Sequence, residues 1–306
     1  MIVVFGSLIA DLVFPVESLP RPGETVAAPG VLVVPGGKGA NQAVAAARTG
    51  SRVRMVGSVG DDVFGNLLMD GLVAAGVDID LIAQVATATG CAAVCVDADG
   101  QNQIVIALGA NAETHADQIA DALLGEDTIV VVQMEIAREE NWKLVRRARA
   151  KGARVLLNAA PGGSVPEDTL RAVDTILVNE IEAVMLCDAV GLDAGDPVAA
   201  GRALRRQFGT DCVVTLGGAG AVAFLGDAAW RFAALPVVAV DATAAGDAFA
   251  GVFASSLDAG IEVIEALRRA SIAGGLACTA TGAQPSLPTG AEIAARLAEL
   301  PNPSRL

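Results

Sequence analysis

Short apolar runs alternate with helical segments along most of this chain, and this alternation limits the possible folds more than any other feature. Ile2–Phe5 is an apolar run that ends at Gly6, and Gly39–Arg48 is an Ala-rich helical segment closed by Gly50. Further strands are predicted at Val53–Val56, Thr128–Val132, Val155–Leu157, Thr175–Val178 and Cys212–Leu216, and further helices at Phe64–Ala75, Arg138–Lys151, Glu180–Val190 and Pro197–Phe208. Such alternation is typical of a mostly parallel sheet with helices on both faces. We therefore expect one α/β domain over residues 1–306, folded as a three-layer sandwich.

Two segments interrupt this rhythm. Glu24–Val34 and Gly90–Leu108 are rich in β-branched residues and turns, and the second contains the hairpin signal Asp97-Ala-Asp99-Gly100. We expect strands from about 12–35 and 88–109 to form a small antiparallel sheet outside the main sandwich. A lid over a binding site is its functional interpretation, and a surface excursion without function is the alternative.

Composition excludes several classes of function. Against 35 acidic residues the chain has 21 basic ones, a net charge of −14, which disfavours binding to nucleic acid. His115 is the one histidine and the five cysteines form no C-x-x-C pair, so a His-rich zinc site is implausible and the cysteines are expected as core residues of a reducing compartment. Apolar runs are interrupted before about 18 residues, so no membrane span is predicted. With a strand starting at Met1, no secretory segment is expected, and the predicted location is cytoplasmic.

The stretch Asp241-Ala-Thr-Ala-Ala-Gly-Asp247-Ala-Phe-Ala-Gly251 carries the strongest chemical signal. A turn containing Gly246 opens an apolar helix, and Asp247 lies at the helix start. Free backbone N–H groups at a helix start favour a phosphate or a developing oxyanion. A carboxylate there can take a proton from a hydroxyl while the amides hold the transferring phosphoryl group. This combination is what a small-molecule kinase needs.

A second Gly-rich element, Pro35-Gly-Gly-Lys-Gly-Ala-Asn41, joins a strand to a helix start. Adjacent glycines allow the backbone to approach a ligand closely. Lys38 and Asn41 add hydrogen-bonding groups that suit a polyhydroxylated substrate. The element is not a P-loop, because Leu32 stands where the first glycine would be and Gly39 where Ser or Thr would be.

Two further elements follow predicted strands. Thr215-Leu-Gly-Gly-Ala-Gly220 is a Gly-rich turn that would let a nucleotide lie against the backbone. Asn179 and Glu182 are three residues apart at a helix start, where they can order water around Mg²⁺. A plain N-cap with a first-turn acid explains the second pair equally well.

These elements, taken in order along the whole chain, resemble the ribokinase-like (PfkB) carbohydrate kinase family. The two signature regions of the family match Gly36–Arg48 and Asp241–Gly251, and Gly282–Ser286 also resembles it. The resemblance is strongest to members that phosphorylate D-ribose, which also use Ala-Ala-Gly-Asp in the second signature. It implies an ATP-dependent kinase that acts on the terminal hydroxymethyl group of a pentose, with Mg²⁺ and K⁺ as cofactors.

The resemblance also implies a role for each matching position. Asp247 matches the catalytic base, and the neighbouring anion hole matches Ala244, Ala245 and Gly246. Positions that contact the sugar match Ile9, Asp11, Gly37, Lys38, Asn41 and Glu135. Asn179 and Glu182 match the element tied to Mg²⁺ and phosphates, Glu182 acting on Mg²⁺ indirectly, and the nucleotide loop matches Thr215, Gly217 and Gly220. A monovalent-cation loop matches Asp241, Thr243, Ala277, Ala280, Gly282 and Ser286, mostly through main-chain carbonyls.

Two positions depart from the pattern. Members that act on D-ribose carry Asn where this chain has Ile9, and Thr where it has Ala242. A sugar hydroxyl buried against Ile9 without a partner costs roughly 1–3 kcal/mol. The alternatives to D-ribose are therefore 2-deoxyribose or a nucleoside, on the same fold.

Two other classes of function stay open for an alternating α/β chain. A non-catalytic sugar-binding regulator would not need the base, Asp247, that the chain retains. A dinucleotide-binding oxidoreductase would need G-x-G-x-x-G after the first strand, where this chain reads Gly6-Ser-Leu-Ile-Ala-Asp11. An exposed small sheet needs cover, and the apolar run Val31–Val34 predicts a homodimer that packs lid against lid.

Overall fold

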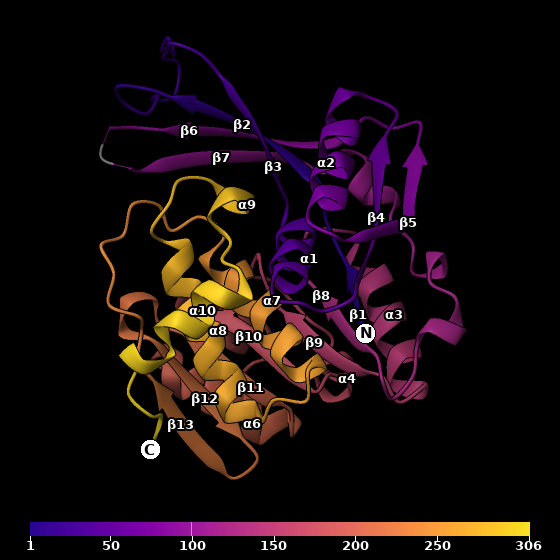
Figure 1. Cartoon of the computed structure of the whole chain (residues 1–306), viewed down its shortest axis with the longest axis vertical. Helices are drawn as coiled ribbons and strands as arrows, with labels where there is room; N and C mark the ends of the chain where they lie inside the picture. The colour runs from indigo at the N-terminus through magenta and orange to yellow at the C-terminus, as the bar shows by residue number, and fades with distance from the viewer. Residues whose placement is uncertain (99) are drawn as a thin grey trace.

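The computed structural model describes residues 1–98 and 100–306, and its largest element is a ten-stranded sheet (Figure 1). The strand order is β14-β13-β12-β11-β10-β9-β8-β1-β4-β5. Its strands are β1 (Ile2–Phe5), β4 (Val53–Gly60), β5 (Asp78–Val85), β8 (Ile129–Val132), β9 (Arg154–Asn158), β10 (Thr175–Asn179), β11 (Asp211–Thr215), β12 (Ala221–Leu225), β13 (Ala228–Phe232) and β14 (Ser304–Arg305). Pairing is parallel from β5 to β11 and antiparallel from β11 to β14. The expected mostly parallel sheet is confirmed.

Helices cover both faces of this sheet, because its buried strands are apolar on both sides. In β1, Ile2 and Val4 pack into one core, whereas Val3 and Phe5 pack into the other. The first core contains α1 (Lys38–Arg48), α2 (Val63–Ala74), α7 (Ala245–Asp258), α8 (Val263–Ala277) and α10 (Gly290–Arg296). The second contains α3 (Arg138–Ala150), α4 (Glu167–Ala172), α5 (Glu180–Ala189) and α6 (Pro197–Phe208). The three-layer sandwich is therefore confirmed.

Small residues bring α1 and α7 into unusually close contact. A Cβ atom added at Gly251 would lie 2.5 Å from the Gln42 carbonyl oxygen and 2.6 Å from the Ala45 Cβ atom. Only glycine therefore permits this approach, and Ala45 on the facing side keeps the gap narrow. The packing places the first turn of α7 beside the first turn of α1, and both turns belong to the two signature motifs.

A second sheet of four strands lies outside the main sandwich, at the upper left of Figure 1, beside α2 and above α9 (Ala283–Ser286). Its order is β3-β2-β6-β7, with bounds β2 (Ile9–Pro15), β3 (Leu32–Gly36), β6 (Gly90–Val96) and β7 (Asn102–Ala107). The expected antiparallel pairing holds for β2–β3 and β6–β7, while the central pair β2–β6 is parallel. Asp99, within the predicted hairpin, lies outside the described residues.

The boundaries of the small sheet differ from those expected. Its first strand begins at Ile9, three residues before the predicted start near 12, because the chain leaves the main sheet where β1 ends at Phe5 and pairs with β3 and β6 from Ile9 on. Strand structure within the predicted Glu24–Val34 segment is limited to residues 32–34, at the start of β3. The predicted β-rich segment is therefore too long, since residues 25–31 adopt no regular structure.

Most predicted elements are present within a few residues of the expected bounds, and Pro197–Phe208 is a helix with the expected ends. Among the described elements, no prediction covers β5, the β12–β13 hairpin, β14, the helices α4, α8, α9 and α10, or the short 3₁₀ turns. The short helix α9 (Ala283–Ser286) lies on the Gly282–Ser286 motif. Among the described residues, no helix is both long enough and apolar enough to span a bilayer.

Candidate active site

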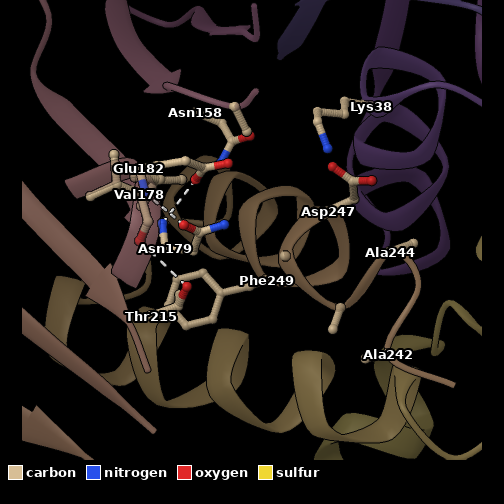
Figure 2. A pocket seen from close by; sticks show the side chains of 14 residues that line it. Lys38, Asn158, Val178, Asn179, Glu182, Thr215, Ala242, Ala244, Asp247 and Phe249 are labelled. Carbon is tan, nitrogen blue, oxygen red and sulfur yellow. Dashed lines mark hydrogen bonds between the residues drawn. The ribbon is translucent and has the colours of Figure 1, made fainter. Parts of the chain in front are cut away.

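A pocket of about 210 Å³ opens between the carboxyl ends of β9, β10 and β11 and the start of α7. Parallel α/β sheets bind ligands at this edge. The lining residues are Lys38, Asn158, Ala160, Leu177, Val178, Asn179, Glu182, Thr215, Ala242, Ala244, Ala245, Gly246, Asp247 and Phe249. Figure 2 shows that Lys38 and Asp247 point toward one another on one side, with Asn179, Glu182 and Thr215 on the other. The structure thus places residues of four predicted motifs around one space.

The start of α7 is shaped for an anion. Ala244 adopts a left-handed conformation, with φ 61°, and α7 begins at Ala245. The N–H of Ala245 donates to the Ala242 carbonyl and that of Ala248 to the Ala244 carbonyl. Among the described residues, no acceptor receives the N–H groups of Gly246 and Asp247. Both amides therefore remain free to hold an oxyanion beside the Asp247 carboxylate.

Two side-chain amides of α1 hold the Asp247 carboxylate. Asn41 donates from Nδ2 to Oδ2 at 3.0 Å, and Gln42 donates from Nε2 to Oδ1 at 2.9 Å. All three side chains are buried, Asp247 with 6% of its surface exposed. A carboxylate keeps about four lone-pair positions, so both oxygens can still accept a proton. The geometry fixes the orientation of Asp247 and leaves lone pairs available on both oxygens.

Lys38 lies within a ring of carboxylates. Its Nζ is 3.9 Å from Oε1 of Glu135, and its backbone N–H donates to Oε2 of Glu135 at 2.9 Å. The Ser7 hydroxyl donates to the same oxygen at 2.6 Å. Burial alone would lower the pKa of Lys38, but nearby carboxylates, first those of Asp247 and Glu135, outweigh it and raise that pKa. Lys38 is therefore a fixed positive charge at the pocket, and it is paired with Glu135.

Asp11 lies on β2, an inner strand of the small sheet. Burial, reinforced by the negative charge of Glu135, raises its pKa from 3.8 to about 6. A Cβ atom at Gly36, on the neighbouring strand, would lie 2.1 Å from Oδ2 of Asp11, so glycine is required there. Gly37 has φ 89°, and its added Cβ atom would lie 2.8 Å from the backbone nitrogen of Ile9. Ile9 itself is buried, with 2% exposed.

Asn179 and Glu182 form a reciprocal cap at the start of α5. Asn179 Oδ1 accepts from the Glu182 N–H at 2.8 Å, and Glu182 Oε2 accepts from the Asn179 N–H at 2.9 Å. The capping alternative raised by the sequence is therefore present, and both residues also line the pocket. Burial, together with the charge of Asp247, raises the pKa of Glu182 despite the opposing backbone hydrogen bond and Lys38.

The predicted nucleotide loop divides into two parts. Thr215 lines the pocket, and its hydroxyl donates to the Val178 carbonyl at 3.4 Å. Gly217, at φ 51°, is exposed in the turn between β11 and β12. Gly220 is buried, and a Cβ atom there would lie 1.9 Å from the Phe232 carbonyl oxygen. Close packing against β13 is a sufficient reason for glycine at position 220.

Three residues of the predicted cation loop are joined by one carboxylate. Asp241 Oδ1 accepts from the N–H and hydroxyl of Thr243, and Oδ2 accepts from the Gly282 N–H at 2.9 Å. Partial burial raises the pKa of Asp241, but these hydrogen bonds outweigh it and lower that pKa. The Ser286 hydroxyl donates to the Ala283 carbonyl instead. Ala277 ends α8, and Ala280 is exposed in the connection that follows.

Several residues of the site had no prediction from the sequence, including the lining residues Ala160, Leu177 and Val178. Gln42 contacts Asp247 directly, although it belongs to the motif that drew attention to Asn41. Asn158 and Phe249 line the pocket. Asn158 follows a predicted strand, so its position at the carboxyl edge of the sheet was an available signal. Gln42 lies in the first turn of α1, one residue after Asn41, and only the α1–α7 contact reveals its direction.

A model of the pfkB family of carbohydrate kinases matches residues 1–290. The chain belongs to this family. Ribokinase of Lactococcus lactis is 33% identical over 300 residues, covering 97% of each chain, and deoxyribokinase of Salmonella typhi is 33% identical over 293 residues, covering 94% of this chain and 95% of its own. The crystal structure of Thermotoga maritima ribokinase has a TM-score of 0.91 at 34% identity, covering 97% of this chain and 99% of its own.

The structure of Arabidopsis thaliana ribokinase complexed with ribose and ATP has a TM-score of 0.85 at 30% identity, covering 97% of this chain and 98% of its own. These findings confirm the family inferred from the sequence motifs. This PfkB kinase is an ATP-dependent sugar kinase, and the pocket described above is lined by residues of both signature regions, among them Lys38 and Asp247.

Proposed function

We propose that this kinase transfers the γ-phosphoryl group of ATP to the terminal hydroxymethyl oxygen of a pentose, with D-ribose as the first candidate. The observation that carries the proposal is the buried Asp247 carboxylate, held by Asn41 and Gln42 beside two free N–H groups of α7. Ribokinase and deoxyribokinase relatives support a pentose as the acceptor.

The side chains divide the reaction between them. Asp247 takes the proton of the hydroxyl as its oxygen bonds to the γ-phosphorus and the bond to the leaving ADP oxygen breaks. The N–H groups of Gly246 and Asp247 hold the negative charge on the transferring group. Lys38 supplies a fixed positive charge on the same side of the pocket. Asp11, Asn41 and Glu135 orient the sugar, with Gly37 allowing its close approach.

Nucleotide and Mg²⁺ are assigned to the far side of the pocket. Asn179, Glu182 and Thr215 face it with hard oxygen atoms, the type of donor that suits Mg²⁺ and its bound waters. Glu182 fits an indirect role, since one of its oxygens is engaged in the helix cap. When bound, Mg²⁺ neutralises charge on the phosphates. Gly217 and Gly220 belong to the turn that we assign to the nucleotide.

K⁺ is assigned to the loop centred on Asp241. The donors there are oxygens: the Asp241 carboxylate and the carbonyls of Thr243, Ala277, Ala280 and Gly282, with the Ser286 hydroxyl nearby. Such a donor set fits a monovalent cation, and the lowered pKa of Asp241 keeps its charge in place. When bound, K⁺ would brace the Asp241–Ala244 segment that leads into α7, without touching the substrate.

2-Deoxy-D-ribose is the second candidate, because Ile9 gives the sugar floor an apolar, buried surface. A hydroxyl facing it would lose a partner at a cost of about 1–3 kcal/mol, whereas a deoxy position would not. Deoxyribokinase of Salmonella typhi has the same 33% identity to the chain as ribokinase of Lactococcus lactis.

Steady-state turnover of ATP tests the proposal. The acceptors are D-ribose, 2-deoxy-D-ribose, fructose and adenosine, each with Mg²⁺ and with or without K⁺. Turnover of D-ribose stimulated by K⁺ supports the first candidate. A preference for 2-deoxy-D-ribose or adenosine would change the proposed substrate and leave the proposed phosphoryl transfer in place. Absence of turnover with every acceptor, in protein that binds a sugar, would favour a non-catalytic regulator.

We assign the four-stranded sheet the role of a lid within a single kinase domain, residues 1–306, working in the cytoplasm. Side chains alternate along its strands, so Leu32, Ile104 and Ile106 lie on the face that carries Asp11, and the opposite face exposes Val33 and Val105, the latter to 73%. Burial against a second copy would cover this face, so a homodimer through the lid is part of the proposal. Light scattering at micromolar concentration tests it, and a monomer would contradict it. Val105→Lys, on exposed β7, should convert a dimer to monomer.

A further inference from the structure

Asp247 is the end of a chain of buried amide side chains that begins on the opposite helical layer. Asn141 on α3 donates from Nδ2 to the backbone carbonyl of Gln133, which follows β8. Gln133 donates from Nε2 to Oε1 of Gln42 at 2.8 Å, and Gln42 donates to Oδ1 of Asp247 at 2.9 Å. Asn141, Gln133 and Gln42 are each 0% exposed.

The direction of these hydrogen bonds follows from their chemistry. Ionised Asp247 only accepts, so the amide nitrogen of Gln42 must face it and the amide oxygen must face away. Gln133 occupies that oxygen with an N–H donor, which excludes the flipped orientation of the Gln42 amide. The second N–H of Gln42 points toward Asn158 Oδ1, at 3.5 Å. The Gln42 amide is therefore fixed at both ends.

Backbone packing holds Gln133 in turn. A Cβ atom added at Gly6 would lie 1.8 Å from Oε1 of Gln133, so the absence of a side chain at Gly6 makes room for the amide. Gly6 directly follows β1. The neighbour of β1 in the sheet is β8, the strand that precedes Gln133. The sequence feature that ends β1 thus also makes room for the chain of amides.

We propose that Gln42 and Gln133 are positioning residues for the catalytic base: Gln133 fixes the amide of Gln42, and Gln42 aims the Asp247 carboxylate at the sugar hydroxyl. This inference rests on the proposed role of Asp247 as the base. Neither glutamine touches the reacting atoms in this assignment. Their effect is on the direction and charge of the carboxylate, so it appears in turnover rather than in substrate affinity.

Gln42→Met and Gln133→Met test the proposal, because methionine keeps the approximate volume and removes the hydrogen bonds. For Gln42→Met we expect kcat to fall roughly 10- to 100-fold, with KM for D-ribose and ATP within about threefold. Gln133→Met should give a smaller fall of the same kind. Because Gln133 acts through Gln42, the double variant should lose no more kcat than Gln42→Met alone.

The pH profile separates positioning from general destabilisation. Lys38 on α1, Asp11 on β2 and Glu182 on α5 also interact with the charge of Asp247 and stay unchanged in these variants, as does Glu135, which acts on Lys38 and Asp11. Loss of the Gln42 donor removes stabilisation of the carboxylate charge, so the acidic limb of kcat/KM should move to higher pH in both single variants, by roughly half a unit to one unit. A purely structural role would lower thermal stability and leave this limb in place.

Gln118→Met is the matched control. Its amide also donates to two carbonyls, those of Gly57 and Leu81, but it lies outside the pocket. It should lose stability without a change in kcat or pH profile. Unchanged kcat and pH profile in folded Gln42→Met and Gln133→Met, or additive losses in the double variant, would overturn the inference. If Gln42→Met does not fold, Gln133→Met alone decides the question by the same two readouts.

Asp247→Asn separates this inference from the proposed function. An inactive Asp247→Asn with nearly normal glutamine variants would refute only the positioning role. A fully active Asp247→Asn would refute the assignment of the base, and the inference with it.

Discussion

Asn41 and Asp247 are 206 positions apart in the chain, yet Asn41 Nδ2 donates to Asp247 Oδ2 over 3.0 Å. The other end of the same amide, Asn41 Oδ1, is buried and has no partner among the described residues. A buried acceptor without a partner is costly, and a sugar hydroxyl would satisfy it. In the function we propose, one amide would therefore link recognition of the sugar to orientation of the base.

Asp247→Asn should abolish the proton transfer while keeping the fold. The substitution is isosteric, and general-base catalysis contributes about 10²- to 10⁴-fold, so kcat should fall by a factor in that range. Circular dichroism and sugar binding by calorimetry serve as controls for folding and for the pocket. Turnover within tenfold of the native rate would show that another group takes the proton.

Asp11→Asn should stabilise the ligand-free protein above pH 6. The folded pKa of Asp11, about 6, lies above the ordinary value of 3.8, so the folded state holds a proton that the unfolded state releases. Stability contributed by this group is full below pH 3.8 and is lost as the pH rises to about 6. At pH 7.5 the variant should therefore gain about 1–3 kcal/mol in unfolding free energy, and at pH 4 almost nothing.

Urea unfolding at the two pH values measures this difference for Asp11→Asn. Asp80→Asn, at an exposed position on β5, is the control and should show no pH-dependent gain. The same Asp11→Asn variant should bind D-ribose more weakly, because it loses a charged acceptor. An equal effect on stability at pH 4 and pH 7.5 would show that ionisation of Asp11 is not the cause.

Ala244→Gly should relieve backbone strain at the start of α7. Among the described residues, Ala244 is the one non-glycine residue with positive φ, at 61°. A left-handed conformation costs a residue with a Cβ atom about 1–2 kcal/mol, and the added freedom of unfolded glycine offsets about 0.4–1 kcal/mol of the gain. The net gain in unfolding free energy should be about 0.5–1 kcal/mol.

Ala259→Gly is the matched control for strain at Ala244, since Ala259 ends the same helix at φ −76°. There glycine should destabilise by about 0.5–1 kcal/mol, because it relieves no strain. Chemical denaturation of both variants measures the difference. Destabilisation of the same size at both positions would contradict the assignment of strain.

Ile9→Asn should shift the preference between sugars. A polar group at this buried floor can pair with a sugar hydroxyl, which is worth about 1–3 kcal/mol in discrimination. The ratio of kcat/KM for D-ribose to that for 2-deoxy-D-ribose should therefore rise about tenfold or more. Ile9→Val keeps the floor apolar and should leave the ratio unchanged. No change in the Ile9→Asn ratio would place the determinant elsewhere.

The main sandwich could be predicted because its elements carry local signals. The alanines of Gly39–Arg48 and the glycine at position 50 predict the helix that is present there. Ile2–Phe5 is apolar on both faces because helices cover both faces of the sheet. The parallel pairing of β2 with β6 carries no such signal, since it joins strands far apart in sequence. The early start of β2 at Ile9 has the same origin: tertiary pairing, and not local propensity, sets it.

In the site, too, residues in motifs with local signals could be predicted, and residues placed by tertiary packing could not. Asp247 and Lys38 belong to motifs whose glycines and helix starts predict contact with a ligand. Gln42 is one residue beyond Asn41, and its direction depends on how closely α1 approaches α7 through Gly251. Gly220, predicted as a nucleotide contact, is explained by its closeness to the backbone at Phe232. The direction of a side chain and the reason why a position needs glycine can be read only from the packed structure.

The residues assigned to the sugar belong to two different sheets. Ile9 and Asp11 lie on β2 of the small sheet, whereas Asp247 lies in the first turn of α7, a helix packed on the large one. A sugar that contacts both is therefore a tether between them, and its release frees one sheet from the other. Amide hydrogen exchange in β2 and β6 should accordingly record whether the acceptor site is filled, independently of any turnover.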